Sequence, residues 1–213
     1  MLDQIWGFKK DIAYLSVQHM QLVLIAGVLA IAVALPLGVW LSRPGQRRIA
    51  EGVMQAFNVG QAVPKLALLA LAMSAMGIGA APAIFGLWIA TLLPIVRNTY
   101  EGLLAVPAQL IEAATSMGMT PRQILYRVEL PNAAYVIFAG IRTALAITVG
   151  TAPLAFLIGG GGLGELIFSG IDLNDMAMML AGAIPTALLA IATDFVCGQC
   201  QYWLVSRGVN PLR

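Results

Sequence analysis

Few residues of this chain have the chemistry that catalysis requires. The single histidine, His19, supports no credible Ser/His/Asp triad, and no two carboxylates stand in a recognisable hydrolytic arrangement. Cys197 and Cys200 form a CxxC pair, but a zinc site needs about four ligands and a redox dithiol needs a soluble βαβ context. We therefore interpret the cysteines as two helical thiols, and we predict a chain with no metal site, no cofactor and no catalysis of its own.

The glycine run Gly159–Gly162, followed by Leu163, Gly164 and Glu165, invites comparison with a nucleotide-binding loop. Loops of that kind carry Gly-Lys-Ser/Thr at the start of a helix, because the lysine reaches the phosphates. No glycine in this chain precedes a lysine. We therefore expect a flexible turn in this segment.

The composition identifies the class of protein that holds these residues. The chain has 213 residues, of which 60% are hydrophobic and only 10% charged, and its mean hydropathy is +0.86. Soluble domains are about 25% charged, so these few charges cannot cover a water-soluble monomer. Disorder and nucleic-acid binding are excluded for the same reason. The chain is predicted to be one polytopic membrane domain, residues 1–213, without a cleavable signal.

Apolar stretches of about 20 residues predict membrane-spanning helices. We predict an all-α fold with five spans, at about residues 20–41, 52–76, 83–104, 134–158 and 176–193, and a tail from 194 to 213. Arginines gather in one set of loops, and Glu165, Asp172 and Asp175 in the other. The positive-inside rule makes the arginine side cytoplasmic, which puts the N-terminus outside and the C-terminus inside. We expect Arg142 to anchor at the interface or to pair with Glu129, and Asp194 to mark the same interface.

The polar stretch 107–131 between the third and fourth spans predicts two short cytoplasmic helices. Pro107 suits a first helical position and Gly118 a helix C-terminus. Thr120 and Gln123 then form a capping box for a second helix, which Pro131 is expected to end. Polar helices between spans have no role in lipid, so we interpret them as a docking element. A DNA-reading helix-turn-helix would need a basic face and a soluble domain, and both are missing.

Within this stretch, Glu112-Ala113-Ala114, then Gly118, and finally Leu130-Pro131 resemble the EAA loop of ABC-importer permeases. The resemblance implies the type I importer fold, with this loop forming coupling helices that sit in a cleft of an ATPase subunit. It also implies partners: two ATPase subunits that bind ATP and Mg, a second permease chain and an extracytoplasmic solute-binding protein, all at the bacterial inner membrane. Glu112, Ala113, Ala114, Gly118, Leu130 and Pro131 would carry the coupling.

Other segments extend the resemblance over most of the chain, toward the permeases of osmoprotectant importers for glycine betaine, carnitine, choline or proline betaine. They include Gln61–Pro64, Arg97–Gly102 and Gly159–Glu165. The resemblance suggests a translocation pathway near Gln61, Pro64 and Lys65. It also suggests an external gate that includes the residues Gly161, Gly162, Gly164 and Glu165.

Lys65 departs from the pattern of that branch, where a small or polar residue is expected after the proline. An ionisable residue inside a span either lines a cavity or snorkels to the interface, and both remain open here. A lysine in the pathway would favour a carboxylate-bearing or acidic solute. We therefore keep importers of another small zwitterion, such as ergothioneine, or of an amino acid as alternatives. An ATP-independent secondary transporter would need internal repeats, and we see none.

Overall fold

The computed structural model describes residues 2–205 and 208, and these residues form helices and connecting turns without a strand. The helices α1 (Leu2–Gly7), α2 (Lys9–Leu41), α3 (Arg47–Ala62), α4 (Lys65–Met76), α5 (Ala80–Leu104) and α6 (Ala108–Ser116) make up the first half. The second half holds α7 (Pro121–Ile124), the π-helix η1 (Leu125–Glu129), α8 (Leu130–Thr151), the 3₁₀ helix η2 (Ala152–Ile158), α9 (Gly164–Asp172) and α10 (Met176–Leu204). The predicted all-helical fold is confirmed.

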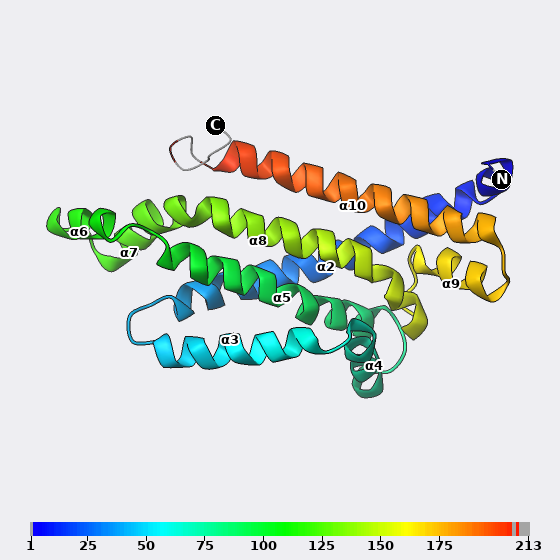
Figure 1. Ribbon diagram of the computed structural model, residues 1–213, viewed down its shortest axis with the longest axis horizontal. Helices are drawn as coiled ribbons and strands as arrows, with labels where there is room; N and C mark the ends of the chain where they lie inside the picture. The colour runs from blue at the N-terminus through cyan, green and yellow to red at the C-terminus, as the bar shows by residue number, and fades with distance from the viewer. Residues whose placement is uncertain (1, 206–207, 209–213) are drawn as a thin grey trace.

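Four helical stretches of the described chain are long and apolar enough to cross a membrane: α2, α5, the run Pro121–Ile158 and α10. They lie lengthwise beside one another, with α6 and α7 at one end of the bundle and α1 and α9 at the other (Figure 1). The pair α3 and α4 is apolar enough for a fifth crossing, but it is bent by 99°.

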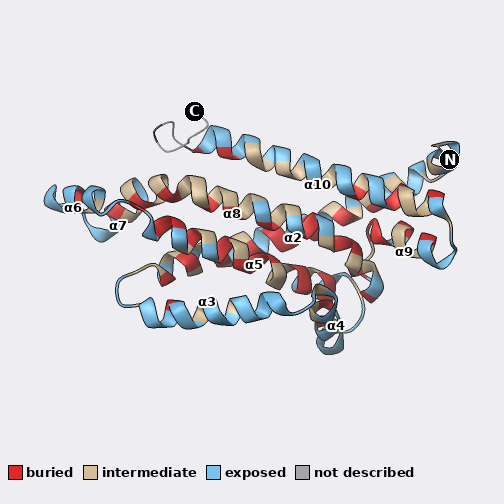
Figure 2. Ribbon diagram, in the orientation of Figure 1, coloured by how far each residue is buried: buried red, intermediate tan, exposed pale blue. Residues whose placement is uncertain are grey.

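The centre of the bundle is α5, packed between α2 and α8. Side chains from these helices form the two main buried clusters, which include Val23, Leu87 and Val149 at one end and Ala34, Ile95 and Ala144 at the other. Small residues permit close approach, as at Gly140, where a Cβ atom would overlap Asn98. The hydroxyls of Thr91 and Thr148 add a 2.8 Å hydrogen bond between α5 and α8. Figure 2 shows this buried centre and the exposed surface of α3.

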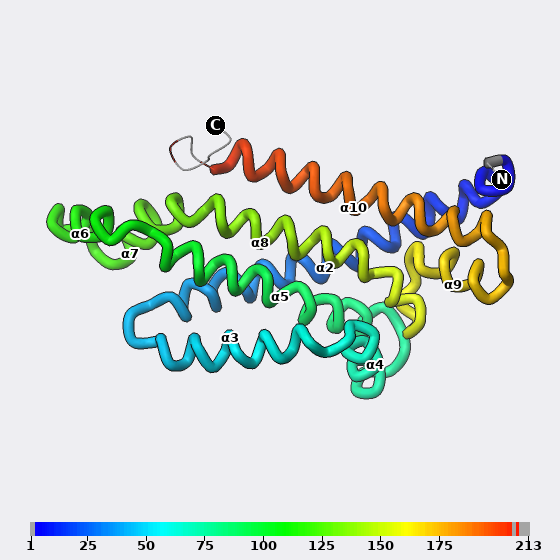
Figure 3. The backbone as a smooth tube through the Cα atoms, viewed as in Figure 1, coloured from blue at the N-terminus to red at the C-terminus, as the bar shows by residue number. Residues whose placement is uncertain are grey.

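The expected span 52–76 is not one straight helix, and Pro64 is the physical reason. A proline disfavours helical geometry at the preceding residue, and Val63 is extended, with φ −68° and ψ 125°. The chain therefore turns between α3 and α4, and α4 runs across the direction of α3 (Figure 3).

The sequence had led us to expect that Pro131 ends a short helix, but the helix continues through it. The chain is helical from Pro121 to Ile158, because the π-helix η1 precedes the proline and the Leu130 N–H donates to the Leu125 carbonyl, five residues back. This widened turn lets the chain pass a residue without an N–H while it remains helical. Similarly, α10 continues past Asp194 to Leu204, so the described part of the expected tail is mostly helix.

Candidate functional site

The loop 107–131 holds the first candidate site, at the end of the bundle where α6 and α7 lie (Figure 1). α6 follows Pro107, which is the N-cap rather than the first helical residue. Gly118 ends the turn after α6 with φ +78°, a conformation that glycine adopts without strain. The predicted capping box is confirmed, since the Thr120 side chain accepts from the Gln123 N–H and the Gln123 side chain accepts from the Thr120 N–H.

The side chains of α6 divide into an inward and an outward face. Glu112 and Ala113 are exposed, whereas Ala114 is 1% exposed and packs against its own chain. Of the two alanines expected to carry the coupling, only Ala113 is therefore exposed to a partner. Ile111, on the inward side, packs against the buried cluster of Leu103, Val106, Ala133 and Ile137. α6 is thus attached to the ends of α5 and α8 and presents Glu112 outward.

A partly buried ion pair ties this end of the bundle to α2. Nη1 of Arg43, just after α2, donates to Oε2 of Glu129 in η1 at 2.7 Å. The Arg43 guanidinium also donates to the Val39 carbonyl and to the Ser42 hydroxyl. Arg43 is therefore the partner of Glu129, for which the sequence had suggested Arg142 as one possible partner.

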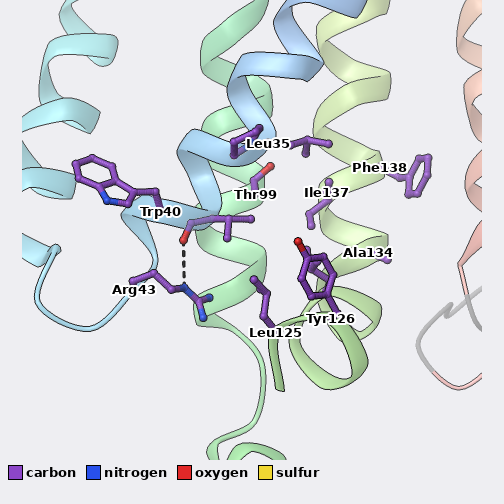
Figure 4. A pocket seen from close by; sticks show the side chains of 12 residues that line it. Leu35, Trp40, Arg43, Thr99, Leu125, Tyr126, Ala134, Ile137 and Phe138 are labelled. Carbon is purple, nitrogen blue, oxygen red and sulfur yellow. Dashed lines mark hydrogen bonds between the residues drawn. The ribbon is translucent and has the colours of Figure 1, made fainter. Parts of the chain in front are cut away.

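Beside this ion pair lies an apolar cavity of about 640 Å³. Figure 4 shows side chains from α2, α5, η1 and α8 around it, with Arg43 at its edge. Leu130 from the predicted coupling set lines the same cavity, whereas Pro131 is half-buried beside it. The ends of α2, α5 and α8 therefore meet where the loop joins the bundle.

The pathway candidates lie at the break between α3 and α4. Gln61 and Lys65 line a second cavity, of about 670 Å³, together with residues of α5 and α8. Pro64 makes the break and is exposed, but it does not line the cavity. The structure therefore brings together two of the three residues expected in the pathway.

The glycine segment lies at the opposite end of the bundle, in the turn between η2 and α9. Gly159, Gly161 and Gly162 have positive φ angles of +76°, +75° and +84°. The Gly162 N–H donates to Oε1 of Gln18 at 2.8 Å. Gly164 is buried, and a Cβ atom there would overlap the Pro153 carbonyl.

Of the expected gate residues only Glu165 is exposed; Gly162 and Gly164 are buried, and Gly161 is half-buried. Two residues on α2 that lie against this turn, Gln18 and His19, were not predicted from the sequence. Gln18 accepts from Gly162, and His19 is completely buried with Nε2 3.1 Å from the Val149 carbonyl. Both contacts join residues at least 130 positions apart, so no local pattern could indicate them.

Arg142 pairs with Asp194 across α8 and α10, and not with Glu129. Nε and Nη2 of the guanidinium each donate to one carboxylate oxygen of Asp194, in the bidentate geometry that arginine favours. Gly198 lies close to the same guanidinium and leaves room for it. Cys197 and Cys200 are free thiols on α10, and no group of three metal-binding side chains occurs among residues 2–205 and 208.

A family model described as "Binding-protein-dependent transport system inner membrane component" matches residues 34–206. This chain belongs to that family. The permease is thus a multi-pass component of the inner membrane, as the EAA-like residues had indicated.

Several relatives match most of the permease. It is 54% identical over 198 residues to the osmoprotectant import permease protein OsmY of Salmonella typhimurium, covering 89% of this chain and 84% of the relative. It is 42% identical to the carnitine transport permease protein OpuCB of Listeria monocytogenes, covering 92% of this chain and 89% of the relative. It is 40% identical to the choline transport system permease protein OpuBB of Bacillus subtilis, covering 95% of this chain and 93% of the relative.

The fold also matches a solved transporter. The inward-facing MetNI methionine ABC transporter has a chain that superimposes with a TM-score of 0.80 at 25% identity, covering 92% of the permease and 98% of that chain. The type I ABC-importer fold implied by the resemblance is thereby confirmed.

Proposed function

We propose that the permease is the membrane-spanning subunit of an ATP-driven importer for osmoprotectants such as glycine betaine, carnitine and choline. The observation that carries this proposal is its 54% identity over 198 residues to an osmoprotectant import permease. Permeases named for carnitine and choline transport, at 42% and 40% identity, support the same class of solute. A binding protein delivers the solute and an ATPase supplies the energy.

The coupling element in this proposal is α6. Its exposed Glu112 and Ala113 enter the ATPase, while Ile111 holds the helix on α5 and α8. The ion pair of Arg43 and Glu129 passes the displacement on to α2. ATP-driven closure of two ATPase subunits would therefore move the spans together, which is the requirement for alternating access.

The assembly and orientation follow the same proposal. The chain contributes up to five crossings, which enclose little volume, so a second permease, identical or a sister chain, completes the pathway. The loop with Glu112 faces the cytoplasm, which places the N-terminus outside and the C-terminus inside. α1 and the end of α10 lie at opposite ends of the bundle, as this orientation requires (Figure 1).

The test is uptake of labelled glycine betaine, carnitine and choline after a salt upshift, in a strain that lacks only this gene. We expect loss of uptake of at least one of these solutes. Unchanged uptake of all of them, in a strain without other osmoprotectant importers, would refute the proposed solute class. Ergothioneine and amino acids would then be the next solutes to assay.

A second experiment tests the coupling assignment. Glu112→Arg should abolish ATP-driven uptake at an unchanged membrane level, because it reverses the charge on the exposed face of α6. Asp3→Arg is the matched control, since Asp3 is an exposed carboxylate on α1 at the other end of the bundle. Normal uptake by the Glu112 variant would remove α6 from the coupling mechanism, and ATP-independent uptake would indicate a secondary transporter.

A further inference from the structure

The cavity of about 670 Å³ at the break between α3 and α4 has an almost entirely apolar lining. Its walls are apolar residues of α3, α4, α5 and α8, such as Val53, Leu68 and Leu93. Gln61 and Lys65 are the only lining residues with polar side chains, and Phe57 is the only aromatic one. Small-molecule sites typically measure about 300–1,000 Å³ and combine apolar walls with a few polar groups.

Lys65 brings a charge into this apolar space without a counter-ion. Within residues 2–205 and 208, its ammonium group makes no ion pair and no hydrogen bond. A cation among apolar groups is unfavourable unless an anion or water compensates it. An anionic group of a solute would provide that compensation.

The backbone beside Lys65 is interrupted, which is compatible with a site that lines a cavity. Val63 and Pro64 interrupt the helix, and the two halves diverge by 99°. Irregular backbone at membrane depth is tolerated where it is buried in protein or lines a water-filled space. Gln61, Val63 and Lys65 at this break line the cavity, while Val63 and Pro64 are themselves exposed in this chain.

The charge of Lys65 separates the candidate solutes into two groups. Glycine betaine and carnitine carry a carboxylate together with a quaternary ammonium group, whereas choline carries only the ammonium group. An ammonium ion without a carboxylate is repelled by Lys65, and a single phenylalanine, Phe57, does not form the aromatic cage that recognises such ions.

We propose that this cavity is a solute site in which Lys65 binds the carboxylate of a zwitterion. The permease itself, and not only its binding protein, then selects carboxylate-bearing solutes over choline. Gln61 lies beside the lysine in the same lining and donates a further hydrogen bond to the carboxylate. This inference rests on the proposed osmoprotectant function.

The experiment compares uptake of glycine betaine, carnitine and choline by the complete importer in cells without other uptake systems for these solutes. The variants are Lys65→Gln, which removes the charge, Lys65→Arg, which keeps it, and Gln61→Glu, which places an anion beside it. Lys10→Gln is the matched control, because Lys10 is an exposed lysine at the start of α2. The binding protein is the same in every strain, so a changed ratio between solutes comes from this chain.

We expect Lys65→Gln to lower uptake of glycine betaine and carnitine relative to choline by about tenfold, the factor that corresponds to a hydrogen bond to a charged group. Gln61→Glu should change the ratio in the same direction, and Lys65→Arg and Lys10→Gln should keep the parent ratio. If the Lys65→Gln variant does not reach the membrane, the uptake ratio of the Gln61→Glu variant tests the inference instead.

Three results would overturn the inference. Equal effects of Lys65→Gln on all the solutes would identify the lysine as structural or as a side chain that snorkels to the interface. A parent importer that takes up choline but neither zwitterion would overturn the inference and leave the proposed function standing. A parent that takes up none of the solutes would overturn both.

Discussion

The ion pair of Arg43 and Glu129 is the contact whose loss should affect both the stability and the coupling of the permease. It joins the end of α2 to η1, next to the loop that carries Glu112. The side chains of Arg43 and Glu129 are 30% and 11% exposed, so the pair is largely withdrawn from solvent. We consider the variants Arg43→Met and Glu129→Gln, alone and together.

The two single variants should differ in their effect, because the partners left behind differ. After Glu129→Gln, Arg43 still donates to the Val39 carbonyl and the Ser42 hydroxyl, and we expect a loss of about 1–2 kcal/mol of unfolding free energy. After Arg43→Met, Glu129 keeps no ion pair within the described residues, and a buried, unpaired carboxylate costs about 3 kcal/mol. The coupling energy of the pair should be about 2 kcal/mol, between the values for buried and surface pairs.

The chain provides a matched control in Arg97 and Glu101. This pair has a similar distance, 2.8 Å, but it is an i,i+4 pair on α5 with both side chains 54% exposed. Its coupling energy should be at most about 0.5 kcal/mol. The assay is a double-mutant cycle for each pair, with unfolding by SDS titration in mixed micelles, together with the number of ATP molecules hydrolysed per solute imported.

Equal coupling energies for the two pairs would refute the reasoning from burial. A larger loss for Glu129→Gln than for Arg43→Met would refute the reasoning from residual partners. If both variants hydrolyse ATP and import solute in the parent ratio, the pair stabilises the bundle but does not transmit motion from α6.

Three further changes test how the loop and the glycine turn are built. Gly118→Ala should destabilise the loop by about 1 kcal/mol because the φ angle of Gly118 is +78°. The control Gly52→Ala should be neutral or stabilising, because Gly52 has open space around it in α3. Hydrogen exchange of the loop 107–131 measures the destabilisation, and equal exchange in the two variants would contradict the prediction for Gly118. Thr120→Ala removes the capping box and should lower the stability of the loop by about 1 kcal/mol. We expect faster proteolysis between α6 and α8, and unchanged proteolysis would show that the cap does not stabilise the loop. Gly164→Ala places a Cβ atom on the Pro153 carbonyl and should leave little folded protein in the membrane, so a normal membrane level would show that the turn can move.

Local patterns in the sequence predicted what lies within a few residues along the chain. The capping box of Thr120 and Gln123 and the glycine turn at Gly118 follow from spacings of three residues or from a single backbone requirement. Pro64 also indicated a break in the helix, because a proline disfavours helical geometry at the residue before it. Hydropathy alone nevertheless favoured one continuous span. The break at Val63 was therefore predictable from the sequence but was outweighed by composition.

Pairing across the bundle could not be predicted in the same way. Arg43 and Glu129 are 86 residues apart, and Arg142 and Asp194 are 52 apart. The sequence contains several oppositely charged residues for each of these side chains, and helix rotation and tilt, which depend on packing, decide which of them pair. The burial of His19 could not be predicted from the sequence either, because it depends on α8 lying against α2.

The π-helix before Pro131 has a consequence for how the coupling loop could act at a distance. Had the proline ended a separate short helix, α7 would be hinged to the span and a displacement would be absorbed at the hinge. Instead the chain is helical from Pro121 to Ile158, and Ala144 and Ile147 of the same run line the Lys65 cavity. Leu130 and Ala144 are separated by about 21 Å along a helix that rises 1.5 Å per residue. In the proposed mechanism, a movement imposed on α7 would reach the proposed solute site through the helical run from Pro121 to Ile158, and the ion pair of Arg43 and Glu129 would carry the same movement to α2.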